Sequence, residues 1–369
     1  MGSWFNFIFS ESKEGKLRKA LLSPLCLLSF FYGVLVRVRV SFYRAGLFRS
    51  ASLPCKVISV GNITLGGTGK TPFVILLAEL FRARQIPVAI LSRGYKGSFS
   101  GPSGMVSDGL KILMDGSQAG DEPCLLAGRL PGVPVFIGRE RLLSGRAAVE
   151  RFRVQAVILD DGFQHLPLRR DLNLLLLDAR RPFGNGCLLP RGELREPSNQ
   201  ARRADAIILT KVDLADNILK LKDHLRREAP GCPVFAVRYV PVGIRDPFEG
   251  RTLPPEVLHG KKILGFAGIG SPASFRGSLE NLGAEIVQFD CFRDHYSYRP
   301  EDFRKLLQDA GQRGAEVLVT TEKDAVRLGE FPRGEIPLWV LLIRHEFVAK
   351  EQEPFEAFLW SRLGLEKKE

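Results

Sequence analysis

The sequence predicts an α/β protein with a doubly wound parallel sheet, a second and smaller α/β lobe, and an N-terminal membrane-associated helix. Three observations lead to this prediction. Short apolar runs alternate with amphipathic stretches, a glycine-rich turn joins the first such run to a helical pattern, and a long uncharged segment lies near the N-terminus. Such alternation is typical of βαβ units, whose strands lie parallel in one sheet.

The strand candidates fall into two groups separated by a stretch rich in proline and glycine. The first group alternates with helical patterns at 72–84 and 139–152, and the second with helical patterns at 271–282 and 300–310. Residues 237–255 are predicted to form a hairpin-like β-linker between the groups. We therefore expect a membrane-associated helical segment over 1–50, a core over 51–236, and the linker with the smaller lobe over 237–369. The strand candidates are residues 56–60, 88–91, 133–137, 156–159, 172–177, 206–209, 262–267, 285–289, 316–319 and 338–342.

The composition limits the classes of partner. The chain has 369 residues and a formal net charge of +12, which favours anionic ligands such as phosphorylated substrates or lipid headgroups. No signature of a nucleic-acid-binding module accompanies the basic residues, so we expect no nucleic acid. The six cysteines lie far apart without a C-x-x-C pair, as expected of free thiols in a reducing compartment.

Residues 20–36 form an uncharged run with basic residues on both sides. The length is at the lower limit for a bilayer span, and positive charge at both ends gives no asymmetry to orient one. A signal peptide is disfavoured because no A-x-A-like cleavage site follows, and a buried core helix stays open as an alternative. We expect a monotopic anchor or a single N-terminal helix at the membrane.

A glycine-rich turn follows the predicted strand at 56–60. The segment GNITLGGTGKTP (residues 61–72) has the strand, turn and helix order of a P-loop, which predicts a P-loop NTPase-like fold for the core. In such a loop, backbone amides bind phosphate oxygens, Lys70 reaches the β- and γ-phosphates, and the Thr71 hydroxyl can hold Mg²⁺. The predicted nucleotide contacts are Thr64, Gly66, Gly67, Thr68, Gly69, Lys70 and Thr71.

The loop departs from the usual spacing. The pattern G-x-x-x-x-G-K-T asks for glycine at Thr64, whereas the glycines here are bunched just before the lysine. This bunching resembles the loops of the MinD and dethiobiotin synthetase group. The extra lysine of MinD-type ATPases is absent, since Leu65 occupies that position.

Two adjacent aspartates end another predicted strand. Residues 156–159 lead into Asp160 and Asp161, at the edge where parallel sheets bind ligands, as in a Walker B metal site. Adjacent side chains of a strand point to opposite faces, so only one should contact a metal directly unless the strand has ended. A plain D-G turn is the alternative.

Two further polar residues carry little information alone. Asp121 starts a predicted helix, where an acidic residue is ordinary, and His295 lies in an apparent loop. The segment TKVD (residues 210–213) is similar to the guanine-reading motif of GTPases. It supports an alternative function, a membrane-associated P-loop GTPase or ATPase switch.

Ten motifs in the same order resemble the tetraacyldisaccharide 4'-kinase family, the lipid A 4'-kinases of Gram-negative bacteria. The resemblance covers nearly the whole chain. The motifs are GNITLGGTGKTP (61–72), LSRGYKG (91–97), GDEP (120–123), GRER (138–141), DDGFQH (160–165), LPRGELREP (189–197), LTKVD (209–213), GIGSPASF (268–275), DHYSY (294–298) and TTEKDAV (320–326).

The resemblance implies a cytoplasmic enzyme on the bacterial inner membrane that uses ATP and Mg²⁺. Its expected acceptor is the 4'-hydroxyl of an acylated glucosamine disaccharide 1-phosphate, and its product is lipid IVA. We expect a monomer.

The resemblance also assigns roles to residues. It implies that Lys70 is catalytic and that Thr71, Asp160 and Asp161 serve the metal. Asp121 becomes the general base, with His295 reaching across a cleft as its partner. Two further residues, Glu193 and His165, fall near the nucleotide and metal, and we assign Glu193 to the metal set. Separately, three arginines are predicted to contact the substrate's phosphate, because guanidinium groups suit phosphate oxygens: Arg93, Arg139 and Arg141.

Overall fold

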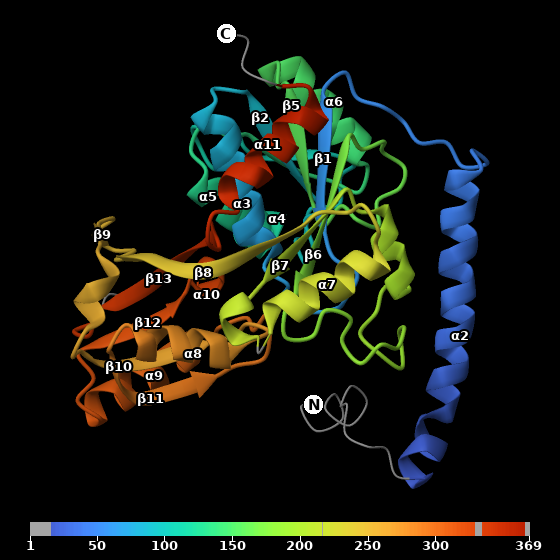
Figure 1. The fold of residues 1–369 in the computed structure, drawn as a ribbon. Coiled ribbons are helices and arrows are strands. Elements are labelled where there is room, and N and C mark those ends of the chain that lie inside the picture. Colours follow the sequence, from blue (N-terminus) through green and yellow to red (C-terminus); the bar gives the residue numbers. More distant parts are fainter. Residues whose placement is uncertain (1–15, 216, 329–333, 366–369) are drawn as a thin grey trace. The chain divides into compact units, whose positions relative to one another are not determined.

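The computed structural model describes residues 16–215, 217–328 and 334–365 (Figure 1). Its contacts divide the chain into two compact units, neither of them continuous in sequence. The first unit contains residues up to 93, 138–238 and 346 onward, and the second contains 94–137 and 239–345. The division differs from the expected boundaries in two places, because 94–137 packs with the second unit and the C-terminal segment with the first.

The first unit is built on a parallel sheet with strand order β8-β7-β6-β1-β5-β2. The chain places β2 and β5 on one side of β1 and then β6, β7 and β8 on the other, as the predicted doubly wound topology requires. Five of these strands are buried along nearly their whole length, which explains their apolar sequences, whereas β8 is exposed or half-buried over its middle. They are β1 (Lys56–Gly61), β2 (Val88–Ser92), β5 (Ala156–Asp160), β6 (Leu172–Asp178), β7 (Ala206–Thr210) and β8 (Val234–Arg245).

Helices cover this sheet. Helix α3 (Lys70–Ala83) contacts β1, β2 and β5 through buried residues that recur at helical spacing. The C-terminal helix α11 (Gln352–Leu363) packs on it, with the Phe73 and Phe355 rings 6.0 Å apart. The other helices of the unit are α6 (Arg141–Phe152), α7 (Ile218–Glu228), η1 (Ser198–Arg203) and η2 (Val212–Leu214).

The second unit also has a parallel arrangement, β11-β10-β12-β13, with helices on both faces. Alternate residues of β10 enter two separate cores, Ile263 with helix α8 and Leu264 with helix α9. Residues 94–137 add the antiparallel pair β3 and β4 together with helix α5. The elements are β3 (Gly104–Ser107), α4 (Gly116–Ala119), α5 (Asp121–Arg129), β4 (Val135–Ile137), β9 (Thr252–Leu253), η3 (Pro255–Leu258), β10 (Lys262–Ala267), α8 (Pro272–Asn281), β11 (Glu285–Cys291), α9 (Pro300–Gln312), β12 (Val317–Thr321), α10 (Glu322–Leu328) and β13 (Leu338–Phe347).

The predicted linker is a β-hairpin. Strand β8 extends from the first unit into the second, and β9 pairs antiparallel with its far end. Strand β13 also has residues in both units, because its last two belong to the first. The chain therefore passes between the units in strands, and it does so at both ends of residues 239–345.

The N-terminal segment forms one long helix, α2 (Lys16–Arg44), which is apolar and long enough to cross a membrane. Only 17% of its most apolar window is buried, so the alternative of a core helix is wrong. One face packs on the first unit, where the Ser29 hydroxyl donates to the Leu188 carbonyl and the Tyr32 hydroxyl to the Arg195 carbonyl. The other face leaves large apolar side chains exposed, among them Leu27, Leu28, Phe30, Phe31 and Leu35.

Candidate active site

The phosphate loop lies between β1 and α3, as the sequence predicts. Two of its glycines, Gly66 and Gly69, have φ angles of 100° and 77°, a region that side chains disfavour. Gly69 is the N-cap of α3, so the free amides of the first helical turn face the loop. Such an arrangement of amides at a helix N-terminus is suited to bind phosphate.

Lys70, the first residue of α3, points its ammonium group toward polar partners at the edge of the sheet. Its Nζ lies 3.4 Å from Asn62 Oδ1 and 3.5 Å from Asp161 Oδ1. Arg195 pairs with the same carboxylate at 3.0 Å. Burial opposes ionisation of Asp161, but the charges of Lys70 and Arg195 prevail and lower its pKa.

Asp160 has a different environment from its neighbour. It is the last residue of β5, lies in register beside Val60 of β1, and is 1% exposed. Its Oδ2 accepts a hydrogen bond of 3.0 Å from Ser92. Asp161, with a φ of 51°, has already left the strand, so the two carboxylates are not held to opposite faces of one strand.

The oxygen donors at this edge of the sheet fit a Mg²⁺ ion that is also bound by nucleotide phosphates. Thr71 and Asp160 offer hard oxygen atoms, and both residues are buried. Within the described ranges, no three His, Cys, Asp or Glu side chains form a metal-binding group. Mg²⁺ is commonly held by one or two protein oxygens together with phosphates and water, so this donor set suits a nucleotide-bound ion.

The LPRGELREP segment pairs with the phosphate loop through its backbone. The Leu65 amide donates to the Glu193 carbonyl at 2.7 Å, and the Arg195 amide donates to the Ile63 carbonyl at 2.8 Å. The Glu193 side chain lies 3.6 Å from Arg181. Glu193 therefore contacts the phosphate loop through its backbone carbonyl.

The TKVD segment also supports the loop. Thr210 donates to the Thr68 carbonyl at 3.0 Å, and Lys211 donates to the Gly67 carbonyl. The Lys211 ammonium is buried and pairs with Asp178 at 2.8 Å. Both contacts are made to backbone carbonyls of the phosphate loop, so this segment stabilises the loop.

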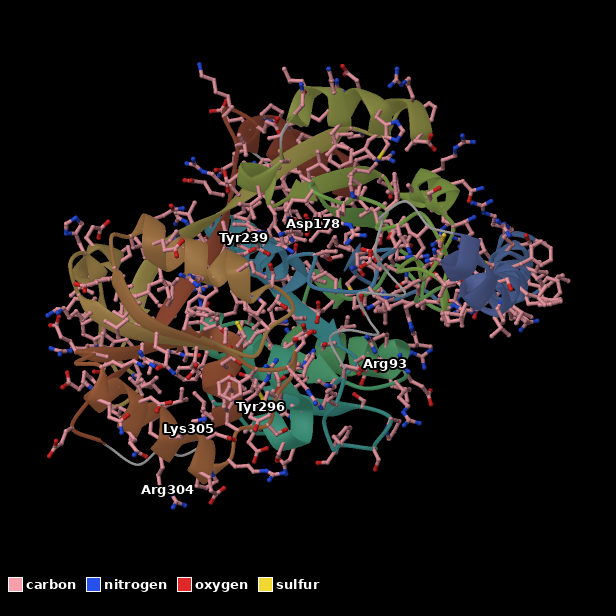
Figure 2. All side chains as sticks on the ribbon, turned by 90° about the horizontal axis from the view of Figure 1, so that it is seen from below. Arg93, Asp178, Tyr239, Tyr296, Arg304 and Lys305 are labelled. Carbon is pink, nitrogen blue, oxygen red and sulfur yellow. The ribbon has the colours of Figure 1, made fainter. Side chains whose placement is uncertain are left out.

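The three predicted arginines differ in exposure. Arg93 follows β2 and is exposed, as is Arg139 (Figure 2 labels Arg93). Arg141 is 3% exposed and donates to the Gly138 carbonyl at 2.6 Å. It therefore supports the backbone at Gly138 instead of facing the solvent. Near them, burial and the surrounding arginines lower the pKa of His165 to about 4, which keeps its imidazole neutral.

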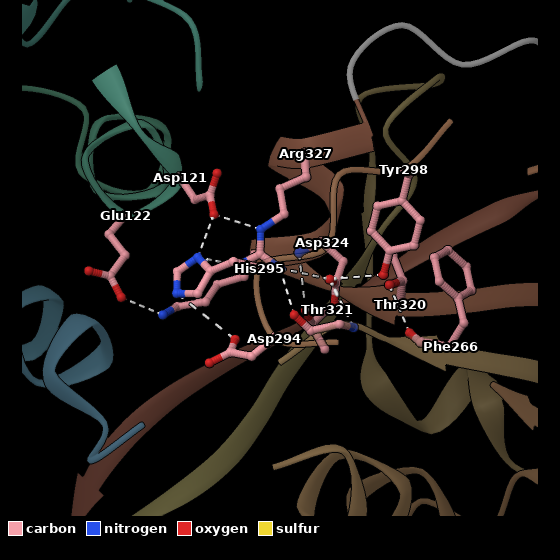
Figure 3. A network of polar contacts seen from close by, with 12 residues as sticks. Asp121, Glu122, Phe266, Asp294, His295, Tyr298, Thr320, Thr321, Asp324 and Arg327 are labelled. Atoms are coloured by element: carbon pink, nitrogen blue, oxygen red, sulfur yellow. Dashed lines mark hydrogen bonds and ion pairs between the residues drawn. The ribbon is translucent and has the colours of Figure 1, made fainter. Parts of the chain in front are cut away.

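Asp121 and His295 lie together in the second unit (Figure 3). Asp121 Oδ2 is 3.1 Å from His295 Nδ1. The expectation that His295 reaches across a cleft is therefore wrong, because 94–137 belongs to the same compact unit as residue 295. The pairing itself is as the resemblance implied.

Sequence reasoning missed one member of this cluster. Arg327 Nε donates to Asp121 Oδ2 at 2.6 Å, and Arg327 Nη2 lies 3.2 Å from His295 Nδ1. Burial would raise the pKa of Asp121, but His295 and Arg327 together lower it. The only signal was the TTEKDAV motif, which ends one residue before Arg327.

Known proteins match this chain over nearly its full length. A family model described as tetraacyldisaccharide-1-P 4'-kinase matches residues 19–364. The tetraacyldisaccharide 4'-kinase of Syntrophus aciditrophicus (strain SB) is 45% identical over 346 residues, which covers 90% of this chain and 92% of that protein. The protein of the same name from Desulfatibacillum aliphaticivorans is 42% identical over 349 residues and covers 92% of each.

A solved structure agrees with the sequence match. LpxK from Aquifex aeolicus, crystallised in complex with ATP, superposes with a TM-score of 0.75 at 32% identity, covering 94% of this chain and 99% of that one. Both the fold and the sequence therefore lead to one conclusion: this chain belongs to the tetraacyldisaccharide-1-P 4'-kinase family.

Proposed function

We propose that this chain transfers the γ-phosphoryl group of ATP to the 4'-hydroxyl of tetraacyldisaccharide 1-phosphate, forming lipid IVA. The observation that supports this most is the phosphate loop over residues 61–71, with Asp160 on the neighbouring strand, in a member of this kinase family. Phosphoryl transfer depends mainly on positioning and on charge neutralisation. The first unit offers groups for both.

On this proposal, Lys70 and the amides at Gly66–Thr71 bind the β- and γ-phosphates. Thr71 and Asp160 would hold Mg²⁺, which would neutralise phosphate charge. Asp160 is the better candidate for the direct ligand, because Asp161 already pairs with Lys70 and Arg195. Asp161 then orients the lysine.

Asp121 serves as the general base for the sugar hydroxyl. Its carboxylate is only 17% exposed and is held by a histidine and an arginine. A positioned carboxylate with a low pKa is ionised at neutral pH and can accept a proton. Arg93 and Arg139 are exposed and can contact the substrate's existing phosphate, whereas the buried Arg141 supports the site.

Helix α2 places the enzyme on the cytoplasmic surface of the inner membrane as a monotopic anchor. Its contacts to the first unit run from Ser29 to Arg39, about 15 Å along the helix. A span would carry the polar backbone of residues 188–195 into the hydrocarbon, where unsatisfied groups are costly. The exposed apolar face instead suits an interfacial position.

The test is a transfer assay with labelled ATP and purified acceptor lipid in mixed micelles. Label should appear in the disaccharide, and unlabelled GTP should compete weakly. Label that never reaches the lipid, together with displacement of ATP by GTP, would support the nucleotide switch instead. Treating the product with a phosphatase and locating the remaining phosphate distinguishes the 4'-position from the 1-position.

A further inference from the structure

Helix α10 carries the TTEKDAV motif and has no part in the proposed function so far. The helix contacts α5, whose first residue is Asp121. Three of its charged side chains pair with α5: Glu322 with Arg129 at 2.7 Å, Lys323 with Glu122 at 2.5 Å, and Arg327 with Asp121 at 2.6 Å. The helix thus holds the segment that presents the base.

Arg327 is the best connected of these side chains, and it is 5% exposed. A guanidinium group has five N–H donors in a fixed plane and no acceptor, so its partners determine its orientation completely. All three of its nitrogens have partners. The contacts are Nε to Asp121 Oδ2 at 2.6 Å, Nη2 to His295 Nδ1 at 3.2 Å, and Nη1 to the Gly268 carbonyl at 2.7 Å and Asp324 Oδ1 at 3.2 Å.

Asp324 fixes Arg327 from behind. Its side chain is fully buried and accepts hydrogen bonds from the Gly268 amide, the Tyr298 hydroxyl and the Thr321 hydroxyl (Figure 3). A Cβ on Gly268 would lie 3.1 Å from both Asp324 Oδ1 and the Tyr298 hydroxyl, so the turn leaves little room there. The Gly268 carbonyl also accepts from the His295 amide at 3.0 Å. One rigid turn therefore orients both His295 and Arg327.

The contacts on Asp121 are asymmetric. Within the part of the chain that the structure describes, both side-chain hydrogen bonds of Asp121 are made to Oδ2. Oδ1 is then the oxygen available to a substrate hydroxyl. A carboxylate held at one oxygen by two donors has little freedom to rotate.

We propose that Arg327, held by Asp324, is a positioning residue that fixes the Asp121 carboxylate with Oδ1 directed to the sugar hydroxyl. This inference depends on the proposed role of Asp121 as the base. Arg327 acts on Asp121 together with His295, because a carboxylate can only accept hydrogen bonds and its Oδ2 contacts both Arg327 Nε and His295 Nδ1.

The charges around Asp121 define what a pH measurement should detect. His295 and Arg327 lower the pKa of Asp121 against the effect of burial. Without the arginine, that pKa rises, and the acidic limb of activity moves to higher pH because a base must be ionised. The other titratable and charged groups near the pair, among the residues that the structure describes, include Tyr95, Glu122, Cys124, Asp294, Tyr298, Lys323 and Asp324.

The test compares kcat/KM from about pH 4 to about pH 8 in Arg327→Met, Arg327→Lys and the wild type. A charge within a few ångströms shifts a carboxyl pKa by about 1–3 units, so the acidic limb of Arg327→Met should rise by about that much. Lysine restores the charge but not the planar geometry, so its limb should stay near the wild type while kcat falls roughly tenfold. The control is Arg129→Gln, which breaks another α5–α10 ion pair and should leave the limb unchanged.

A second variant protects the test against misfolding. Arg327→Met leaves Asp324 as an unpaired buried charge, which can unfold a domain. The double variant Arg327→Met/Asp324→Asn removes both charges and should show the same shift of the limb. A limb that coincides with the wild type in the folded variants would overturn the inference.

The two proposals fail in different ways. If Asp121→Asn keeps wild-type kcat, Asp121 is not the base, and both its role as base and the positioning role of Arg327 are wrong. If Asp121→Asn loses activity while the Arg327 variants keep the wild-type acidic limb, only the positioning role is wrong. The ¹³C shift of the Asp121 carboxyl provides a readout besides activity, since loss of Arg327 should raise the pH at which this carboxyl titrates.

Discussion

The phosphate loop and the Asp121 cluster are assembled in opposite ways. The loop is one run of twelve residues whose glycines, lysine and threonine act where the chain places them. The Asp121 cluster joins a helix start, two turns and a second helix, and Asp121 and Arg327 are 206 positions apart. A local site can be recognised in sequence, whereas a site of this second kind exists only after the second unit has folded.

The largest expected effect separates the two regions by function. Asp121→Ala should lower kcat by about 10²–10⁴-fold, the usual contribution of a general base. ATP affinity should stay close to the wild type, since the phosphate loop belongs to the first unit. Steady-state kinetics and ATP titration by calorimetry measure the two quantities. An unchanged kcat would remove Asp121 from the mechanism.

The corresponding change in the loop should affect both quantities. Lys70→Ala removes a charge aimed at the transferring phosphate and should lower kcat by about 10²–10³-fold. It should also weaken ATP binding, in contrast to Asp121→Ala. Lys56→Ala is the matched control, because Lys56 starts strand β1, which leads into the loop, and pairs with Asp171 at 3.6 Å. If ATP binds Lys70→Ala as tightly as the wild type, the assignment of this lysine is wrong.

His295→Gln tests whether Asp121 and His295 act together. A hydrogen bond to a charged group contributes about 1.5–3 kcal/mol, so its loss should lower kcat roughly 10- to 10²-fold. The thermal transition should persist, because His295 is 22% exposed and packs at the surface of the unit. A variant that loses this transition would instead make His295 a structural residue.

The smallest effect concerns helix α2, which belongs to neither region. Leu35 is 69% exposed, and Leu35→Ser should reduce partition into anionic vesicles about fivefold, corresponding to roughly 1 kcal/mol of lost apolar contact. Leu219→Ser on α7 is the control, since Leu219 is 77% exposed outside α2. Flotation of both variants measures the difference. Equal flotation would argue against the anchor.

Most of the fold could be predicted from the sequence. Most strands were recognisable as β-branched or leucine-rich runs, because parallel strands covered on both faces are largely apolar. Strand β3 and the start of β8 were not among the predicted strands. The hairpin at residues 237–255 was indicated by its proline and glycine content. What the sequence could not indicate was which unit residues 94–137 and 346–365 join, since that depends on tertiary packing.

The same limit applies to the sites. Lys70, Thr71 and Asp160 could be predicted as site residues from their place after strands, where the backbone sets their position. Arg327 was missed because a buried arginine on a short helix has no pattern of its own, and its partners come from distant segments. The separate environments of Asp160 and Asp161 also required the structure, since they depend on the turn at Asp161.

The position of α11 has a consequence for synthesis and for engineering of the chain. Phe355 of α11 contacts Phe73, which lies two residues after Thr71, so α11 supports the helix α3 that begins with the proposed nucleotide ligands. During translation the phosphate loop is synthesised nearly three hundred residues before α11. Competence to bind ATP should therefore appear only after α11 has been made, and removing α11 should damage ATP binding rather than the acceptor side.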